Sequence, residues 1–291
     1  MKNKRTLLII LSIVLLIVLS GCAIPTDENG ATILIDDNTT WRYMFDSEGI
    51  FSSVFVYPVA KLMNYFTKNT GSALLGLVLT VVIAYTIISV LTYRNTVNQQ
   101  KITATQPEIA KIQAKYEGRS DENSRMRQAQ EMQQLYAKYK LNPLTNIIGT
   151  FMQMPLMIAI WHGAQRSYEV VNGSIGDMKL SVTPLDGIRS GKFGYLIIFL
   201  LMVVFQFVSM MLPNWLAQRK AKMEAEKHFR KYVKTPNPAA NTAYIMMGVI
   251  AFLAFTWPAA MSVYWATSSF INCIKLLVIN YFINNKKEKE A

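Results

Sequence analysis

Long runs of apolar residues constrain this sequence more than any other feature. A helix needs roughly 20 mostly apolar residues to cross the hydrocarbon of a bilayer, and five runs approach that length. Apolar residues make up 52% of the 291-residue chain and charged residues only 16%, too little polar surface for a soluble fold of this size. We therefore predict an all-α membrane protein with five transmembrane helices, at residues 73–94, 144–161, 195–212, 243–257 and 261–283.

The segment 51–70 has a different pattern. Its apolar side chains recur at three-four spacing, with Lys61 and Lys68 between them, which is typical of an amphipathic helix lying in the membrane interface. We expect this helix on the outer leaflet. The other predicted segments are an outer tether at 22–50, flexible over 23–40, an outer loop at 162–194, a cytoplasmic loop at 213–242 and a cytoplasmic tail at 284–291.

A cytoplasmic helical hairpin is predicted at 95–143. One narrow apolar stripe runs from Ile102 to Tyr116 and a second from Ala129 to Tyr139, and the polar residues 117–121 interrupt the helical pattern between them. Each stripe is too narrow for a globular core but wide enough for the seam of two antiparallel helices.

The N-terminus has the pattern of a processing signal. A basic start is followed by the apolar stretch from Leu7 to Leu19 and then by Leu19-Ser20-Gly21-Cys22. This resembles a bacterial lipoprotein signal, so we expect residues 1–21 to be cleaved and Cys22 to carry a covalent diacylglycerol and an N-acyl lipid. The alternative is an uncleaved signal anchor with an incidental cysteine. No other cofactor is expected.

The basic residues predict the orientation of the chain. The net charge is +12, but Lys and Arg are gathered between the apolar runs: eight in Lys101–Lys140, seven in Arg219–Lys234 and four in the predicted outer loop from Arg166 to Lys192. Cytoplasmic loops carry an excess of Lys and Arg. We therefore expect the N-terminus outside and the C-terminus inside a bacterial plasma membrane, with no specific nucleic-acid partner.

Polar side chains inside the predicted spans are costly, so each one suggests a function. They gather in the inner halves of the first, second and fifth spans, while the outer halves are mostly apolar, which favours a hydrophilic groove open to the cytoplasm over a channel lined along its whole length. Snorkelling of Arg94 and helix–helix bonding by Ser and Thr are the alternatives. The residues predicted to line the groove and contact a substrate are Ser89, Arg94, Gln153, Gln206, Trp265, Ser269 and Asn272.

The sequence contains no motif typical of a catalytic or metal-binding site. The two cysteines, Cys22 and Cys273, suggest neither a disulfide nor a metal framework, and the histidines His162 and His228 have no ligand-spaced partners. No Gly-rich phosphate loop ends in Lys-Ser or Lys-Thr, and no nucleophile is spaced with a base. We expect neither a metal site nor an enzyme.

Several short strings, in order along the chain, resemble the YidC/Oxa1/Alb3 family of membrane protein insertases, in its Gram-positive lipoprotein form. The resemblance covers about residues 53–283. It rests on Gln106-Pro107-Glu108-Ile109, Asn142-Pro143-Leu144, Gln153-Met154-Pro155-Leu156 and the string from Pro258 to Trp265. It implies insertion of hydrophobic segments of nascent membrane proteins into the lipid bilayer through an inward-open groove, without ATP hydrolysis. The Sec translocon and the ribosome are further candidate partners.

One departure from the family pattern concerns the groove arginine. The resemblance places that arginine near Ser89, whereas the arginine of the predicted first span is Arg94. Either Arg94 reaches the groove by its long side chain, or the groove works without this charge. Two other functions stay open from the sequence: a small transporter or channel, and a folding chaperone for membrane proteins inserted by another machine.

Overall fold

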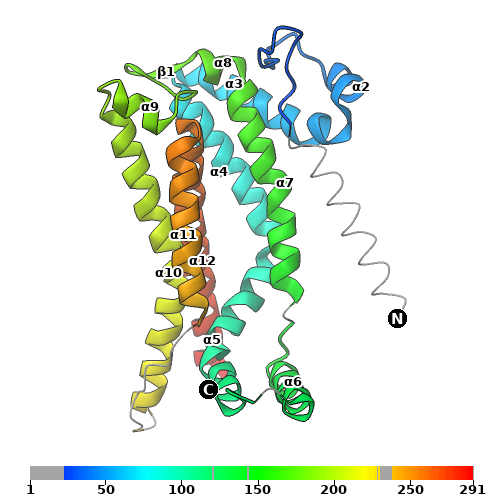
Figure 1. Ribbon diagram of the computed structural model, residues 1–291, viewed down its shortest axis with the longest axis vertical. Coiled ribbons are helices and arrows are strands. Elements are labelled where there is room, and N and C mark those ends of the chain that lie inside the picture. Colours follow the sequence, from blue (N-terminus) through cyan, green and yellow to red (C-terminus); the bar gives the residue numbers. More distant parts are fainter. Residues whose placement is uncertain (1–22, 120, 143, 228, 230–237, 291) are drawn as a thin grey trace. The chain divides into compact units, whose positions relative to one another are not determined.

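The computed structural model describes residues 23–119, 121–142, 144–227, 229 and 238–290. Helices make up most of it, so the predicted all-α membrane class is confirmed (Figure 1). Its sheet is one antiparallel pair of two-residue strands, β1 (Ser174–Ile175) and β2 (Met178–Lys179). The predicted signal peptide 1–21 and the predicted lipidation site Cys22 lie outside the described residues.

Five long apolar helices divide between two compact units. Unit 1 comprises residues up to Ile88, Phe151–Val204 and Ala251–Ser268, and unit 2 comprises Ser89–Thr150, Phe205–Ile250 and Ser269–Ala291. Each of these five apolar helices contributes residues to both units. These helices are α4 (Ala73–Leu91), α7 (Leu144–Arg166), α10 (Gly194–Lys227), α11 (Pro238–Thr256) and α12 (Ala259–Glu290).

Three helices in the described part of the chain are long and apolar enough to cross a membrane: α4, α10 and the Ala259–Phe282 part of α12. The apolar stretch of α11, Tyr244–Thr256, is shorter. For α7 and α11 a transmembrane position therefore stays a prediction.

Two predicted span ends differ from the structure. The first helix, α4, ends at Leu91, and Thr92 breaks the helical geometry before α5 begins at Tyr93, so Arg94 belongs to α5 and not to the first span. Helix α10 does not end at Leu212 but continues through Pro213 to Lys227. A proline removes one helical hydrogen bond and can kink a helix without ending it, so α10 extends past the predicted end of the third span.

The N-terminal helices of unit 1 begin earlier than predicted. Helix α2 (Trp41–Phe51) leads into the π-helical turn η1 (Ser52–Val56) and then into α3 (Tyr57–Thr70). The predicted interfacial stripe is divided: Phe51 and Val59 are buried, while Phe55 and Tyr65 are exposed. Only part of the stripe is therefore available to lipid, because the rest packs inside unit 1.

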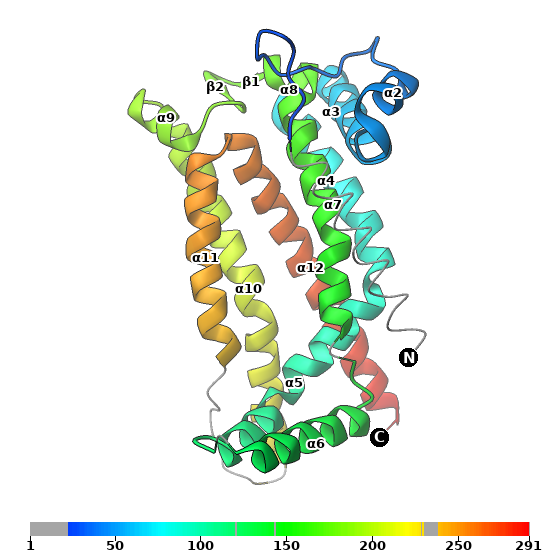
Figure 2. The same cartoon turned by 45° about the vertical axis from the view of Figure 1, so that its right-hand side comes forward.

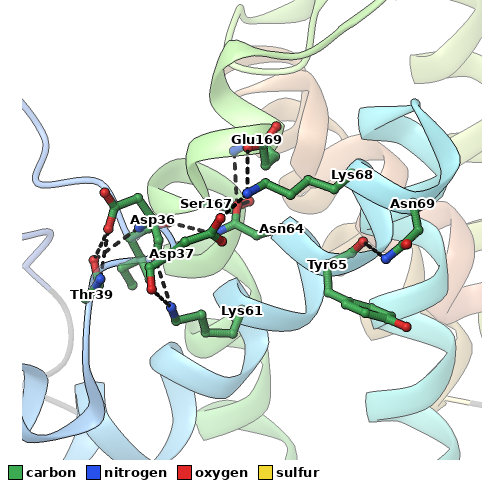
Figure 3. A network of polar contacts seen from close by, with 11 residues as sticks. Asp36, Asp37, Thr39, Lys61, Asn64, Tyr65, Lys68, Asn69, Ser167 and Glu169 are labelled. Carbon is green, nitrogen blue, oxygen red and sulfur yellow. Dashed lines mark hydrogen bonds and ion pairs between the residues drawn. The ribbon is translucent and has the colours of Figure 1, made fainter.

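Asn64 of α3 joins three segments that are far apart in the sequence (Figure 3). Its amide nitrogen donates to the carbonyl oxygen of Ile35 at 2.7 Å. Its amide oxygen accepts from the Ser167 hydroxyl at 2.7 Å and from the backbone N–H of Glu169 at 3.0 Å. Asn64 is only 2% exposed, so these bonds satisfy a polar group that would otherwise be costly to bury.

Charged side chains surround this buried centre. The ammonium group of Lys61 donates to the carbonyl oxygens of Asp36 and Asp37 at 2.8 and 2.9 Å, and Lys68 pairs with Asp37 and, at 3.6 Å, with Glu169 (Figure 3). The hydrogen bond from Lys68 to Asp37 raises the pKa of Lys68. The contacts fix the segment before α2 against α3.

A buried ion pair attaches α2 to the end of α7. The guanidinium group of Arg166 donates to both carboxylate oxygens of Glu48, at 2.7 and 2.5 Å, and its Nε donates to the carbonyl oxygen of Ile33 at 2.9 Å. The side chain of Arg166 is 0% exposed and that of Glu48 is 7% exposed. Polar contacts that composition does not reveal thus attach residues 33–37 of the predicted flexible tether to α3 and α7.

The predicted outer loop 162–194 is also ordered. It contains α8 (Tyr168–Asn172), the β1–β2 pair and α9 (Pro184–Arg189). Carbonyl oxygens of the loop accept hydrogen bonds from the start of α12: Val182 from the N–H of Ala259 at 2.9 Å, and Leu180 from that of Ala260 at 3.0 Å. The first N–H groups of a helix lack partners within the helix, so the loop satisfies them.

In unit 2 the helices α5 (Tyr93–Lys115) and α6 (Glu122–Lys138) contact each other and form the hairpin (Figure 2). Glu131 of α6 accepts hydrogen bonds from the Lys115 ammonium at 2.5 Å and from the Tyr116 hydroxyl at 2.8 Å. The bond from Lys115 lowers the pKa of Glu131. At the other end of the pair, the Tyr139 hydroxyl donates to Glu108 at 2.5 Å.

Removing the buried cation Arg166 should destabilise the protein. In Arg166→Met, Glu48 would remain as a buried charge without its partner, a change that costs about 3–5 kcal/mol in known cases. We expect a lower melting temperature and faster proteolysis between residues 23 and 50. The matched control is Arg42→Met, which breaks the exposed pair with Asp46 and should cost less than about 1 kcal/mol. Equal effects of the two substitutions would contradict this assignment.

Candidate functional site

The candidate site consists of polar side chains on the long apolar helices, and in unit 1 they form a chain of three. Gln153 of α7 donates from Nε2 to the hydroxyl of Tyr85 on α4 at 2.7 Å. That hydroxyl lies 3.1 Å from the hydroxyl of Tyr264 on α12. Tyr264 is 1% exposed and Tyr85 is 5% exposed, whereas Gln153 is exposed. The chain therefore runs from an accessible amide to a buried phenol.

Three tryptophan rings stack one after another in the same unit. Trp257, which follows α11, lies 5.7 Å from Trp161 of α7 and 5.8 Å from Trp265 of α12 between ring centroids, with interplanar angles of 22° and 19°. Trp265 was predicted to line the groove, but its side chain is only 9% exposed and forms one end of this stack. It can support the Gln153–Tyr85–Tyr264 chain through its neighbour Tyr264.

In unit 2 two hydrogen bonds join α10 to α12. The Ser269 hydroxyl donates to Oε1 of Gln206 at 2.5 Å, and Nδ2 of Asn272 donates to the Ser209 hydroxyl at 2.9 Å. Ser269 and Ser209 are buried, and the two amide residues are half-buried. Three of the predicted groove residues, Gln206, Ser269 and Asn272, thus form one polar seam between two helices.

The remaining two predicted residues do not join these clusters through any bond that the structure describes. Ser89 is half-buried near the end of α4, and Arg94 is exposed in the first turn of α5. Since Arg94 lies beyond the end of the first apolar helix, its charge is accessible to water. The long side chain still allows the guanidinium group to meet a negatively charged partner that approaches this end of unit 2.

The two clusters offer hydrogen-bonding groups inside helices whose other faces are apolar. Hydrocarbon supplies no such partners, so a polar segment entering a membrane needs them from protein. Within the described residues no three His, Cys, Asp or Glu side chains gather as metal ligands. The chemistry available at these clusters is hydrogen bonding by amides and hydroxyls.

Sequence reasoning missed three members of the clusters. Tyr264 belongs to the family-like string from Pro258 to Trp265, so its position was noticed but not its role. Ser209 follows Gln206 by three residues, and Tyr85 precedes Ser89 by four, so both share a helix face with a predicted residue. Helical spacing from the predicted residues was the available signal.

Known proteins resemble this chain in sequence. The chain matches the family model of the 60Kd inner membrane protein over residues 65–288. It is 25% identical over 297 residues to the membrane protein insertase YidC 2 of Listeria innocua, covering 100% of this chain and 90% of that protein. It is 28% identical over 247 residues to the membrane protein insertase YidC of Oceanobacillus iheyensis, covering 83% of this chain and 88% of that protein.

A third relative is longer. The chain is 26% identical over 268 residues to the membrane protein insertase YidC of Mycoplasmopsis pulmonis, and the match covers 90% of this chain but only 42% of that protein. The apolar helices and these relatives together show a multi-pass protein of the bacterial membrane. Because the family model spans more than three quarters of its length, the chain belongs to the 60Kd inner membrane protein family.

Proposed function

We propose that this protein is a membrane protein insertase, which takes hydrophobic segments of newly made proteins into the bilayer. The observation that carries the proposal is the pairing of polar side chains within otherwise apolar helices, as in Gln153–Tyr85–Tyr264 and in Gln206–Ser269. Three relatives with the name of insertase support it.

The energetics of the proposed reaction need no nucleotide. Transfer of a client helix of roughly 20 apolar residues from water to lipid lowers the free energy by about 25 cal/mol per Å2 of apolar surface. The obstacle is the polar segment that must cross with it, because unsatisfied backbone groups in hydrocarbon cost several kcal/mol each. Side-chain amides such as those of Gln153 and Asn272 lower that barrier by hydrogen bonding to the segment. The protein then acts without covalent chemistry and without ATP.

The test is site-specific photocrosslinking during synthesis of a single-span client with an acidic outer tail. A probe at Gln153 should crosslink to the nascent client, and the product should disappear once the client is inserted. A probe at Trp265 should give a weaker product, because that ring is mostly buried. The control probe at Phe252, which is 67% exposed on α11, should crosslink mainly to lipid.

The other outcomes distinguish the rival functions. Crosslinks at Gln153 without insertion by the purified protein in liposomes would indicate a folding chaperone. A correctly folded protein with no client crosslinks, combined with solute flux in liposomes, would indicate a transporter or channel. A further probe at Arg127, which is exposed on α6, tests for crosslinks to translocon and ribosomal subunits, because we propose that these two partners meet the chain at its basic hairpin.

Arg94 is proposed to attract the acidic tail of a client. Replacing it by alanine should slow insertion of an acidic-tailed client by about tenfold, the lower end of electrostatic steering effects. The same client with a neutral tail should be unaffected, and Arg94→Lys should retain most of the rate. Arg127→Ala, at an exposed arginine of α6, is the matched control. Unchanged insertion in Arg94→Ala, while Gln153→Ala impairs it, would show that the charge is dispensable.

We further propose that Cys22 carries the lipid anchor, with the N-terminus outside and the C-terminus in the cytoplasm. The signal-like sequence before Cys22 and the basic connectors support this arrangement. Cells fed radioactive palmitate should label the protein, and Cys22→Ser should abolish the label. Cys273→Ser, which removes the other cysteine, is the control and should leave the label intact. A label that persists in Cys22→Ser would favour the signal-anchor alternative.

A further inference from the structure

A cavity of ≈ 390 Å³ lies in unit 2, apart from the two polar clusters. One face of α5 and one face of α10 form its walls, and Asn280 of α12 contributes to its lining. Two small side chains, Ala104 on α5 and Ala217 on α10, are among its lining residues. Its volume is within the range of pockets that bind small molecules.

The lining of this cavity is positively charged. Lys101 of α5 and Lys220 of α10 both line it. Glu108 is the acidic residue among the lining residues that the structure describes, and its carboxylate already accepts the Tyr139 hydroxyl and lies 3.9 Å from the Lys138 ammonium. The acid is thus engaged at the hairpin, and the described lining carries two lysines against one carboxylate.

The position of the cavity along its helices corresponds to the depth of lipid headgroups. On α10 the apolar run gives way to charged residues from Arg219, and Lys220 is the next residue. On α12 the apolar stretch ends at Phe282, two residues after Asn280. Apolar wall residues, Pro213 and Leu216, lie on the membrane side of Lys220 along α10. The lining therefore changes from apolar to cationic where a bilayer changes from acyl chains to phosphates.

We propose that this cavity binds the headgroup of an anionic phospholipid, with the phosphate at Lys101 and Lys220. The amide of Asn280 is suited to headgroup hydroxyls, and Leu216 is suited to the first part of an acyl chain. Basic pockets between transmembrane helices at the cytoplasmic side are known to bind such headgroups. In the topology proposed above this is the cytoplasmic leaflet, but binding does not depend on insertase activity.

Native mass spectrometry of the full-length protein in detergent, with phosphatidylglycerol or phosphatidylcholine added, tests the proposal. The protein should retain more phosphatidylglycerol than phosphatidylcholine. Lys101→Gln and Lys220→Gln should each weaken its retention about fivefold, the effect expected of one basic residue near anionic lipid. The matched controls are Lys111→Gln on α5 and Lys222→Gln on α10, both exposed and outside the cavity lining, which should change retention little.

A second variant tests the cavity itself. Ala217→Trp should fill it and reduce retention while keeping both lysines, and the melting temperature shows whether this variant is folded. Equal retention of the two lipids, or equal losses in the cavity variants and the exposed controls, would overturn the proposal. Complete competition by soluble glycerol phosphate would also overturn it, because the site would then recognise a free phosphate and not a lipid.

Discussion

Hydrocarbon offers no hydrogen-bonding partner, and this constraint governs how polar groups are placed on the long apolar helices. Backbone groups of the long segments are satisfied within helices, so the apolar part of the chain is helical throughout its described length. Polar side chains in these helices meet each other in pairs and chains, as Gln206 meets Ser269 and Gln153 meets Tyr85. Placing a polar side chain on an apolar helix costs free energy in a bilayer. Such a side chain is available to hydrogen-bond with the polar groups of a client.

The cost of burying a polar group without a partner also acts at the end of α7 and in the N-terminal segment of unit 1, where charged side chains take part. Arg166 could not be buried without Glu48, and Asn64 could not be buried without its partners from two other segments. These contacts turn a polar N-terminal segment, which by composition resembles a linker, into part of the folded unit. The start of α12 depends similarly on carbonyl oxygens of the ordered loop after α7.

The helical class, the long apolar helices and the hairpin could be predicted because they follow from the period and length of apolar runs. Helix ends were less predictable. Pro213 is a common helix-ending signal, yet α10 continues through it, and Thr92 ends α4 without any strong signal. Contacts between distant residues left no local pattern at all, which is why the ordering of residues 23–50 by Asn64 and Arg166 was missed. Of the predicted site residues, Gln206, Ser269 and Asn272 do come together, because polar side chains on apolar helices find few hydrogen-bonding partners other than one another.

The stack of Trp161, Trp257 and Trp265 has an optical consequence. Three of the five tryptophans of the chain are in one column of nearly parallel rings, each close enough to its neighbour for their electronic transitions to couple. Coupled indoles give strong circular dichroism in the near ultraviolet and share excitation energy, whereas separated ones do not. The protein therefore carries an internal reporter that registers any change in the spacing of α7, the α11–α12 turn and α12 within unit 1, without an added label.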